Sequence, residues 1–224
     1  MNNTMLNDPN TIVCDHPLCS ENLTVIRDKN TSAEVFRNAV RRLTYLLLYT
    51  ATSDLETEEV TTVTPIAECK TQVLKRDKKI ILAPILRAGL IFSDIASDIL
   101  PNASIRHIGM YRDENTLKPV WYYDKTPIMF DEPQNTIIFI LDPMVATGNS
   151  ALDCINLFVN KKIPIENIRF ISLLAAPEGL EKIRKYYPDI KITTAHIDET
   201  LSKTGYIIPG LGDAGDRIFN TLGD

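Results

Sequence analysis

The sequence has few cysteines, no long apolar run and no excess of basic residues. Its four cysteines, at positions 14, 19, 69 and 154, are too few and too scattered to form a disulfide framework. No apolar run approaches the roughly 20 residues that span a bilayer, so we expect no membrane partner. The opening MNNTMLNDPN is polar and contains no basic residue, which predicts no secretory signal and a cytoplasmic protein.

The charge balance argues against another class of function. With a net charge of −5, the chain lacks the broadly basic surface of a nucleic-acid-binding protein, and we expect no nucleic-acid partner. Local basic sites for phosphate groups are compatible with this charge. A chain of 224 residues that is 44% hydrophobic and 24% charged is typical of one globular domain, here 1–224. Residues 1–14 form an N-terminal extension in which we recognise no signal.

The segment CDHPLC has two interpretations. Cys14, His16 and Cys19 lie close enough in sequence to suggest a zinc ion, but no second cluster completes four ligands. The alternative is a pair of free thiols and a turn at His16-Pro17.

The clearest helix is predicted for residues 30–51. Phe36, Val40, Leu43 and Leu47 recur there at three- and four-residue steps, as expected for one buried face. Thr31 and Glu34 predict a capping box at the start of this helix.

Beyond this helix, apolar strands alternate with helices. Strands are predicted at 79–84, 105–111, 135–142, 167–176 and 190–197, and helices at 89–100, 147–159 and 178–187. This alternation is typical of an α/β fold, with a mostly parallel central sheet and helices on both faces. In such sheets ligands bind beyond the carboxyl ends of the strands.

Two segments depart from the alternation. Residues 111–134 are polar, contain the run Trp-Tyr-Tyr and three prolines, and are interpreted as a hairpin arm. Residues 201–224 form a glycine-rich tail, for which a plain surface loop is the alternative.

Two of the predicted strands end near an arginine. Arg87 follows an apolar strand, and a guanidinium in that position suits a phosphate group, which it binds with two parallel hydrogen bonds. The alternative is an ion pair with a structural carboxylate. Arg112 leaves its strand beside two acidic residues, and a solvated charge cluster is the alternative there.

A third strand leads into the turn 142–150, which reads DPMVATGNS. The first N–H groups of a helix attract an anion, so a monophosphate fits where this turn enters the next helix. Asp142 is placed to accept hydrogen bonds from sugar hydroxyls. The alternative is an ordinary helix start capped by Thr147 or Ser150. The turn lacks the ending of a Walker loop and the spacing of a dinucleotide fingerprint.

A ligand with a phosphate at one end and more negative charge at the other fits these sites, as in 5-phosphoribosyl 1-diphosphate (PRPP). The segments PILRAGL, HIGMYRDENTLKPVWYY, LDPMVATGNSA, AAPEGLEKI and GYIIPGLGDAGDRIFNT, of which the last is the most specific, resemble the uracil phosphoribosyltransferases. The resemblance runs from about residue 15 to the C-terminus. It implies a type I phosphoribosyltransferase fold with a hairpin arm at 111–134 and a base-binding hood at 201–224.

The resemblance also implies the reaction and the residues that perform it. PRPP and uracil would give UMP and pyrophosphate, with Mg²⁺ carried on the diphosphate rather than in a protein-built metal site. The residues implied to bind PRPP are Arg87, Arg112, Asp142, Pro143, Met144, Val145, Ala146, Thr147, Gly148, Asn149, Ser150 and Asp213. Uracil would be received by Ile207, Gly212, Asp213 and Ala214, and the residues expected to act in catalysis are Asp213, Arg112 and Arg87. The resemblance also suggests a homodimer or larger homo-oligomer, with the Trp-Tyr-Tyr arm in the interface, and leaves GTP as a candidate allosteric activator.

One residue departs from the pattern of the family. Asn149 stands where the family usually has glycine, and because asparagine adopts left-handed backbone angles less freely, we expect a lower affinity for PRPP. Three alternatives stay open: a nucleotide-sensing regulator that binds RNA, a pseudoenzyme that binds uracil or UMP without turnover, and a phosphoribosyltransferase for another base.

Overall fold

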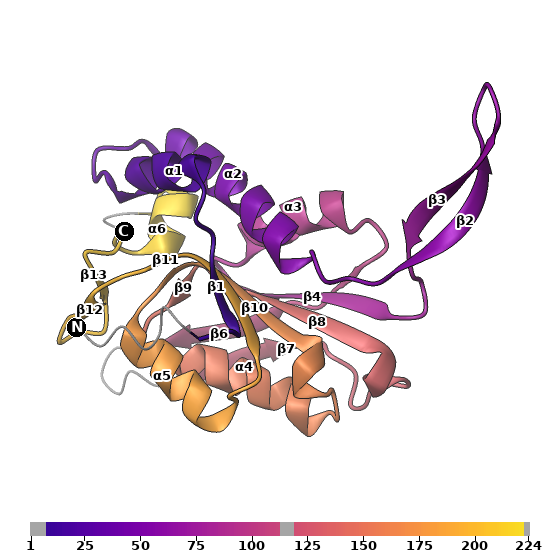
Figure 1. Cartoon of the computed structure of the whole chain (residues 1–224). Helices are drawn as coiled ribbons and strands as arrows, with labels where there is room; N and C mark the ends of the chain where they lie inside the picture. Colours follow the sequence, from indigo (N-terminus) through magenta and orange to yellow (C-terminus); the bar gives the residue numbers. More distant parts are fainter. Residues whose placement is uncertain (1–7, 113–118, 222–224) are drawn as a thin grey trace.

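The computed structural model of this chain describes residues 8–112 and 119–221, apart from the side chain of Arg112. Within these ranges the main sheet has nine strands in the order β1-β11-β10-β8-β4-β6-β7, with β5 paired to β4 and β9 paired to β10 (Figure 1). The pairs are parallel except for β6 with β7. The predicted α/β class and parallel sheet are therefore confirmed.

The strands of the main sheet follow the predicted order along the chain. They are β1 (Thr11–Val13), β4 (Lys79–Leu86), β5 (Ser104–Ile105), β6 (Ile108–Arg112), β7 (Pro119–Asp124), β8 (Thr136–Leu141), β9 (Met144–Val145), β10 (Ile168–Ala175) and β11 (Lys191–Ile197). The strand predicted at 105–111 is divided into β5 and β6. Strand β1 was not predicted and pairs with β11, so part of the N-terminal extension belongs to the sheet.

Helices cover both faces of the sheet. Figure 1 shows α1 (Pro17–Arg27), α2 (Ala33–Ala51), α3 (Leu90–Ile99) and α6 (Ala214–Phe219) on one side, and α4 (Asn149–Asn160) and α5 (Pro177–Tyr186) on the other. Strand β8 is buried along its whole length, and its side chains alternate between the two cores. Phe139 packs in the core that contains Phe36 of α2, whereas Ile140 packs in the core that contains Phe158 of α4.

The start of α2 differs from its prediction in one detail. Its N-cap is Ser32, whose hydroxyl accepts a hydrogen bond from the Val35 N–H at 3.4 Å. Thr31 instead donates its hydroxyl to the Val25 carbonyl at 2.7 Å. The expected capping box at Thr31 is therefore wrong, because that side chain ties the preceding loop back to α1.

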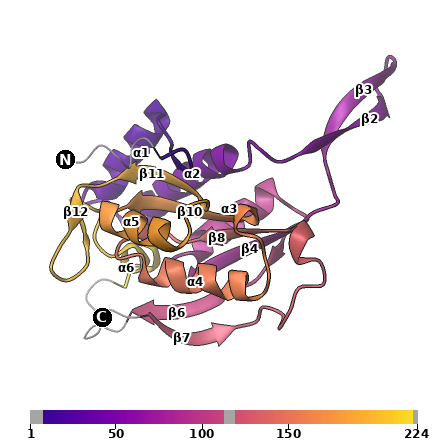
Figure 2. The same ribbon diagram turned by 60° about the horizontal axis from the view of Figure 1, so that its bottom comes forward.

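The structure contains two hairpins of different kinds. Strands β6 and β7 pair antiparallel where the sequence predicts a hairpin arm at 111–134, and β7 continues the sheet at its edge (Figure 2). Strands β2 (Thr57–Val63) and β3 (Glu68–Leu74) form a second hairpin, which was not predicted and stands away from the body of the protein (Figure 1).

The C-terminal segment forms a small hood beside the sheet. Strand β11 is not the last strand, because β12 (Thr200–Leu201) and β13 (Ile207–Ile208) follow it as a short antiparallel pair before α6. Arg217 of α6 is buried and donates to the carbonyls of Ile26, Leu211 and Asp28. Its guanidinium also lies 4.3 Å from the ring centre of Phe36. These contacts fix the hood to α1 and α2.

No helix in the described ranges is long and apolar enough to cross a membrane.

Candidate active site

A cavity of about 270 Å³ lies beyond the carboxyl ends of β4 and β8, where a parallel sheet places its ligands. Residues of the turn 142–150, which is predicted to bind phosphate, and residues of the hood both line this cavity. Of the residues predicted to bind ligands, those that line it are Arg87, Asp142, Met144, Val145, Ala146, Thr147, Gly148, Asn149, Ser150, Ile207, Gly212, Asp213 and Ala214. Segments more than 100 residues apart in sequence therefore meet at one site.

The turn into α4 is shaped by Gly148. This residue is the N-cap of α4 and has a left-handed φ of 75°. A Cβ atom here would also lie 2.8 Å from the carbonyl oxygen of Gly179 in α5. Neither Thr147 nor Ser150 is the N-cap, so the alternative of a helix start capped by one of them is wrong. Asn149 is the first residue of α4 and has no left-handed φ, so the backbone itself does not disfavour asparagine there.

Asp142 follows β8 directly and is one of the residues that line the cavity. Burial raises the pKa of its carboxyl from 3.8 to about 7, against the opposing effect of the Met144 N–H, which donates to Oδ1 at 3.5 Å. Some surface of the residue remains exposed, where it faces the cavity. Its protonation therefore changes near neutral pH, and it is able both to donate and to accept hydrogen bonds there.

Arg87 follows β4, on the far side of a cis peptide bond from Leu86. One of its guanidinium nitrogens lies 3.2 Å from Oδ1 of Asp216 in α6, and its side chain remains 57% exposed. The carboxylate partner proposed as the alternative is thus present. An ion pair with this exposure contributes little to stability, however, and is readily exchanged for an anion that enters the cavity.

The remaining two predicted residues are Arg112 and Pro143. The backbone of Arg112 ends β6, opposite Pro119 of β7, but its side chain lies outside the described part of the structure. Pro143 is buried, and its carbonyl accepts hydrogen bonds from the N–H groups of Leu173 and Leu174. Pro143 therefore ties the turn to β10 instead of facing a ligand.

Asp213 lies in the hood, at the start of α6, and lines the cavity. It is the N-cap of α6, and its Oδ1 accepts a hydrogen bond from the Asp216 N–H at 2.9 Å. A Cβ atom added to Gly215 would lie 3.3 Å from this Oδ1 atom of Asp213. The same Cβ atom would lie 3.9 Å from a guanidinium nitrogen of Arg87. Asp213, Gly215 and Arg87 are therefore neighbours in the lining of the cavity.

Several lining residues were missed by the sequence analysis. They are Ile85, Leu86, Ala88, Met110, Tyr111, Ala151, Gly205, Tyr206 and Gly215. Tyr206 lies within the segment GYIIPG, so its proximity to Ile207 was a usable signal. Met110 and Tyr111 precede Arg112 on β6, and only the pairing of β6 with β4 shows that this strand ends at the same cavity.

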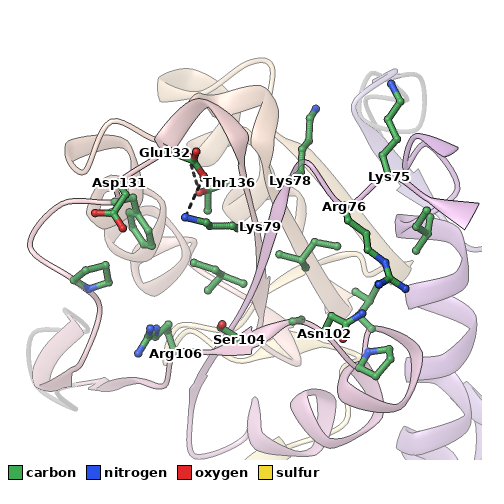
Figure 3. Close-up of a pocket in the computed structure, with 18 of the residues that line it drawn as sticks. Lys75, Arg76, Lys78, Lys79, Asn102, Ser104, Arg106, Asp131, Glu132 and Thr136 are labelled. Atoms are coloured by element: carbon green, nitrogen blue, oxygen red, sulfur yellow. Dashed lines mark hydrogen bonds and ion pairs between the residues drawn. The ribbon is translucent and has the colours of Figure 1, made fainter. Parts of the chain in front are cut away.

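A larger cavity of about 800 Å³ lies at the opposite end of the strands, near the amino ends of β4 and β8. Figure 3 shows its basic side chains, contributed by Lys75, Arg76, Lys78, Lys79 and Arg106. It contains none of the residues predicted to bind substrates. We place the chemistry in the smaller cavity, because that one lies at the carboxyl ends of the strands and gathers the turn, Arg87 and the hood.

The CDHPLC segment does not form a metal cluster. The Nδ1 atom of His16 accepts the N–H of Leu18 as the N-cap of α1, and the sulfur atoms of Cys14 and Cys19 lie 2.9 Å apart. Among the described residues, no group of three or more His, Cys, Asp or Glu side chains is placed to hold a metal ion.

Solved structures with the same fold include a phosphoribosyltransferase. Adenine phosphoribosyltransferase from Trypanosoma brucei, solved with AMP, pyrophosphate and ribose-5-phosphate, has a TM-score of 0.56 at 12% identity, covering 92% of this chain and 88% of that chain. This chain therefore has the fold of a phosphoribosyltransferase. A protein from Aquifex aeolicus is more similar, with a TM-score of 0.84 and 35% identity over 93% of this chain and 97% of that chain.

The sequence comparisons define the family within this class. The family model described as uracil phosphoribosyltransferase matches residues 13–221. Proteins named uracil phosphoribosyltransferase from Dictyoglomus turgidum and Fervidobacterium nodosum are 47% and 48% identical over 94% and 93% of this chain, and over 99% and 98% of their own lengths. The chain belongs to the uracil phosphoribosyltransferase family.

Proposed function

We propose that this protein transfers the 5-phosphoribosyl group of PRPP to N1 of uracil, giving UMP and pyrophosphate. In this reaction the bond from C1 of the ribose to the diphosphate breaks, the bond from N1 to C1 forms, and N1 loses its proton. The observation that carries the proposal is that the turn 142–150 and the hood line the same cavity. A phosphorylated sugar at the turn would thus present C1 to a base held by the hood.

The role proposed for each group follows from its position, except for Arg112, whose role is the one that the resemblance to the family implies. The N–H groups at the start of α4 receive the 5-phosphate, and Thr147 and Ser150 add hydroxyl donors. Asp142, at the carboxyl end of β8, accepts hydrogen bonds from the ribose hydroxyls. Arg87 and Arg112 receive the diphosphate, whose charge grows as the bond to C1 breaks. Catalysis then consists mainly of positioning and electrostatic stabilisation.

The hood is proposed to read the base. Uracil presents an acceptor, a donor and an acceptor along O2, N3 and O4. Backbone groups of the segment from Ile207 to Ala214 can match this edge, because β13 and the start of α6 hold that segment against the cavity. Cytosine reverses two of these groups and would leave buried partners unpaired, which gives strong discrimination. Asp213 is proposed to orient N1 or PRPP.

Magnesium is proposed to arrive with PRPP. The carboxylates that line the cavity, Asp142 and Asp213, supply the hard oxygen atoms that Mg²⁺ prefers, and this donor set fits an ion that keeps most of its other ligands from diphosphate and water. When bound, the ion would neutralise part of the negative charge on the leaving group.

The decisive experiment is turnover of labelled uracil with PRPP and Mg²⁺, with cytosine, adenine and orotate as parallel substrates. UMP from uracil alone supports the reaction, the donor and the base together. Product from another base would favour the alternative of a different phosphoribosyltransferase. No product from any base, with GTP present or absent, would contradict the proposal and favour the pseudoenzyme or the regulator.

We also propose that GTP binds in the 800 Å³ cavity and activates the enzyme. Lys75 and Lys79 form ion pairs with Glu56 and Glu132 at 2.6 and 3.1 Å. In the described part of the chain, Arg76 and Arg106 have no such carboxylate partner, so their charges are available to a triphosphate. Replacement of both arginines by alanine is expected to abolish activation and GTP binding by calorimetry. Lys70→Ala, on the outer face of β3, should preserve both.

Homo-oligomers are proposed as the working form, with the β2–β3 hairpin in the interface. A two-stranded hairpin standing alone in water is only marginally stable, and this one carries Val63 and Ile66 at 79% and 96% exposure. Burial against a second copy would cover them.

We further propose a cytoplasmic location, supported by the free thiols of Cys14 and Cys19, which an oxidising compartment would join in a disulfide. Cell fractionation tests this point.

A further inference from the structure

A lysine outside the predicted site contacts the phosphate-binding turn. Lys182 of α5 donates a hydrogen bond from Nζ to Oδ1 of Asn149, the first residue of α4. Asn149 lines the 270 Å³ cavity and also a neighbouring hollow of about 400 Å³, in which Lys182 and Asp153 are among the lining residues. The side chain of Asn149 thus connects the substrate cavity to a cation behind it.

The position of Lys182 is fixed by close backbone packing. Gly179 of α5 approaches the turn so closely that a Cβ atom there would lie 2.3 Å from the carbonyl oxygen of Ala146. On the turn itself, a Cβ on Gly148 would lie 2.8 Å from the Gly179 carbonyl oxygen. Lys182 is three residues after Gly179 and therefore lies on the same face of α5. The lysine is held beside the turn by its helix.

Among the described residues, none forms an ion pair that cancels the charge on Lys182. In the described part of the chain, no carboxylate oxygen lies within 4.0 Å of its ammonium group, although Asp153 lines the same hollow. The side chain is half-buried, so water screens its charge less than on an open surface. The first turn of α4 contains no acidic residue. A positive charge behind the N-terminus of α4 therefore adds to the attraction that its N–H groups exert on an anion.

We propose that Lys182 is a positioning residue for the 5-phosphate of PRPP and acts through Asn149. Its ammonium group holds the Asn149 amide at the start of α4 and adds positive charge behind the turn. The inference rests on the proposed binding of the phosphate at 142–150. It also replaces the expectation that Asn149 weakens PRPP binding, since this side chain is the link through which Lys182 reaches the site.

The first test is the kinetics of Lys182→Met. We expect the KM for PRPP to rise about five- to tenfold, because the variant loses one charge-assisted hydrogen bond whose strength is reduced by partial exposure to water. The kcat and the KM for uracil should stay within about twofold of the wild-type values. Added salt should narrow the difference from wild type. Lys182→Arg should restore most of the affinity. Lys185→Met, on the exposed part of the last turn of α5, should keep the wild-type KM.

A double-mutant cycle with Asn149→Ala tests whether the lysine acts through the asparagine. We expect Lys182→Met to have little further effect on PRPP binding once Asn149→Ala is present. An undiminished effect in that background would overturn the role of Asn149, and an unchanged KM in Lys182→Met would overturn the whole inference. A lower KM for PRPP in Asn149→Gly would also contradict it. The melting temperature of each variant, including Lys182→Gln, shows whether it is folded. A variant with the wild-type melting temperature and a raised KM for PRPP has lost binding and is not misfolded.

A further variant separates this inference from the placement of the phosphate. Thr147→Val should raise the KM for PRPP because a hydroxyl donor on the turn is lost. If Thr147→Val weakens PRPP binding by calorimetry and Lys182→Met does not, only the inference about Lys182 fails. If neither variant changes binding, the phosphate does not occupy this turn, and the proposed site and the inference are both wrong.

Discussion

Arg27 at the end of α1 holds Asp198 with two hydrogen bonds, one to each carboxylate oxygen, at 3.0 and 2.5 Å. The Asp198 side chain is fully buried, and the Arg27 side chain is 23% exposed. Asp198 also accepts the N–H of Gly210 at 2.9 Å, while Arg27 donates to the Gly210 carbonyl at 2.9 Å. This pair therefore joins the end of β11, the first helix and the hood that is proposed to bind uracil.

Removal of this carboxylate should loosen the hood. We expect Asp198→Ala to lower the free energy of unfolding by about 3 kcal/mol, because it leaves Arg27 without its buried partner, and to raise the KM for uracil more than the KM for PRPP. Urea denaturation and steady-state kinetics measure the two effects. Glu59→Ala removes an exposed pair with Lys70 and should cost less than about 0.5 kcal/mol. Equal KM changes for both substrates would contradict the assignment of the hood to uracil.

The raised pKa of Asp142 predicts how stability depends on pH. Its folded pKa of about 7 lies above the ordinary value of 3.8, so between these values the folded state binds more protons than the unfolded state. Stability therefore falls as the pH rises from about 4 through 7. We expect this group to lower the free energy of unfolding by about 2 kcal/mol over this range. This value is about half of what the full pKa difference would give, because solvent in the cavity screens the carboxyl. In Asp142→Asn this part of the pH dependence should disappear, as measured by denaturation at pH 5 and pH 8.

The same carboxyl predicts how PRPP binding depends on pH. If ionised Asp142 accepts hydrogen bonds from the ribose hydroxyls, the KM for PRPP should fall between pH 6 and pH 8 in the wild type, as the carboxyl loses its proton. Asp142→Asn should bind PRPP more weakly and show a flat profile over this range. A variant that keeps the wild-type slope would show that another group causes it.

The contact between Gly179 and the turn predicts a strong effect from one methyl group. Gly179→Ala would place Cβ 2.3 Å from the Ala146 carbonyl oxygen, so α5 or the turn must move. We expect a loss of about 2–3 kcal/mol in unfolding free energy and a rise of at least tenfold in the KM for PRPP. Glu181→Ala, at an exposed position on the same helix, should change neither. An unchanged PRPP KM in Gly179→Ala would mean that the geometry of the turn does not limit binding.

The projecting hairpin predicts a change in assembly. Ile66→Lys, at the turn between β2 and β3, should shift the protein to a smaller species in sedimentation velocity, because a charge would be placed in the proposed interface. The competing interface is the Trp-Tyr-Tyr segment on β7, where Tyr122 is 54% exposed. A shift in Tyr122→Lys, with Ile66→Lys unchanged, would assign the interface to the edge of the sheet instead.

The sequence by itself determined the class of fold and named most of the residues that line the candidate site. The strand β8 is apolar on both faces, as strands are when helices cover both sides of a parallel sheet. The alternation of such strands with helices along the chain was therefore enough to predict the architecture. The turn 142–150 was predicted from local chemistry, since strand, turn and helix start are adjacent in the chain. The arginine after β4 was found in the same way. The hood was implied by the resemblance of the glycine-rich tail to the family.

Tertiary structure decided which distant groups meet. The contacts of Arg27 with Asp198 and of Lys182 with Asn149 join residues 171 and 33 positions apart, and no local pattern encodes such pairs. The pKa of Asp142 and the N-cap at Ser32 likewise depend on what surrounds each side chain after folding. Periodicity and turn chemistry act over a few residues, whereas burial and long-range hydrogen bonds exist only when the whole chain is packed.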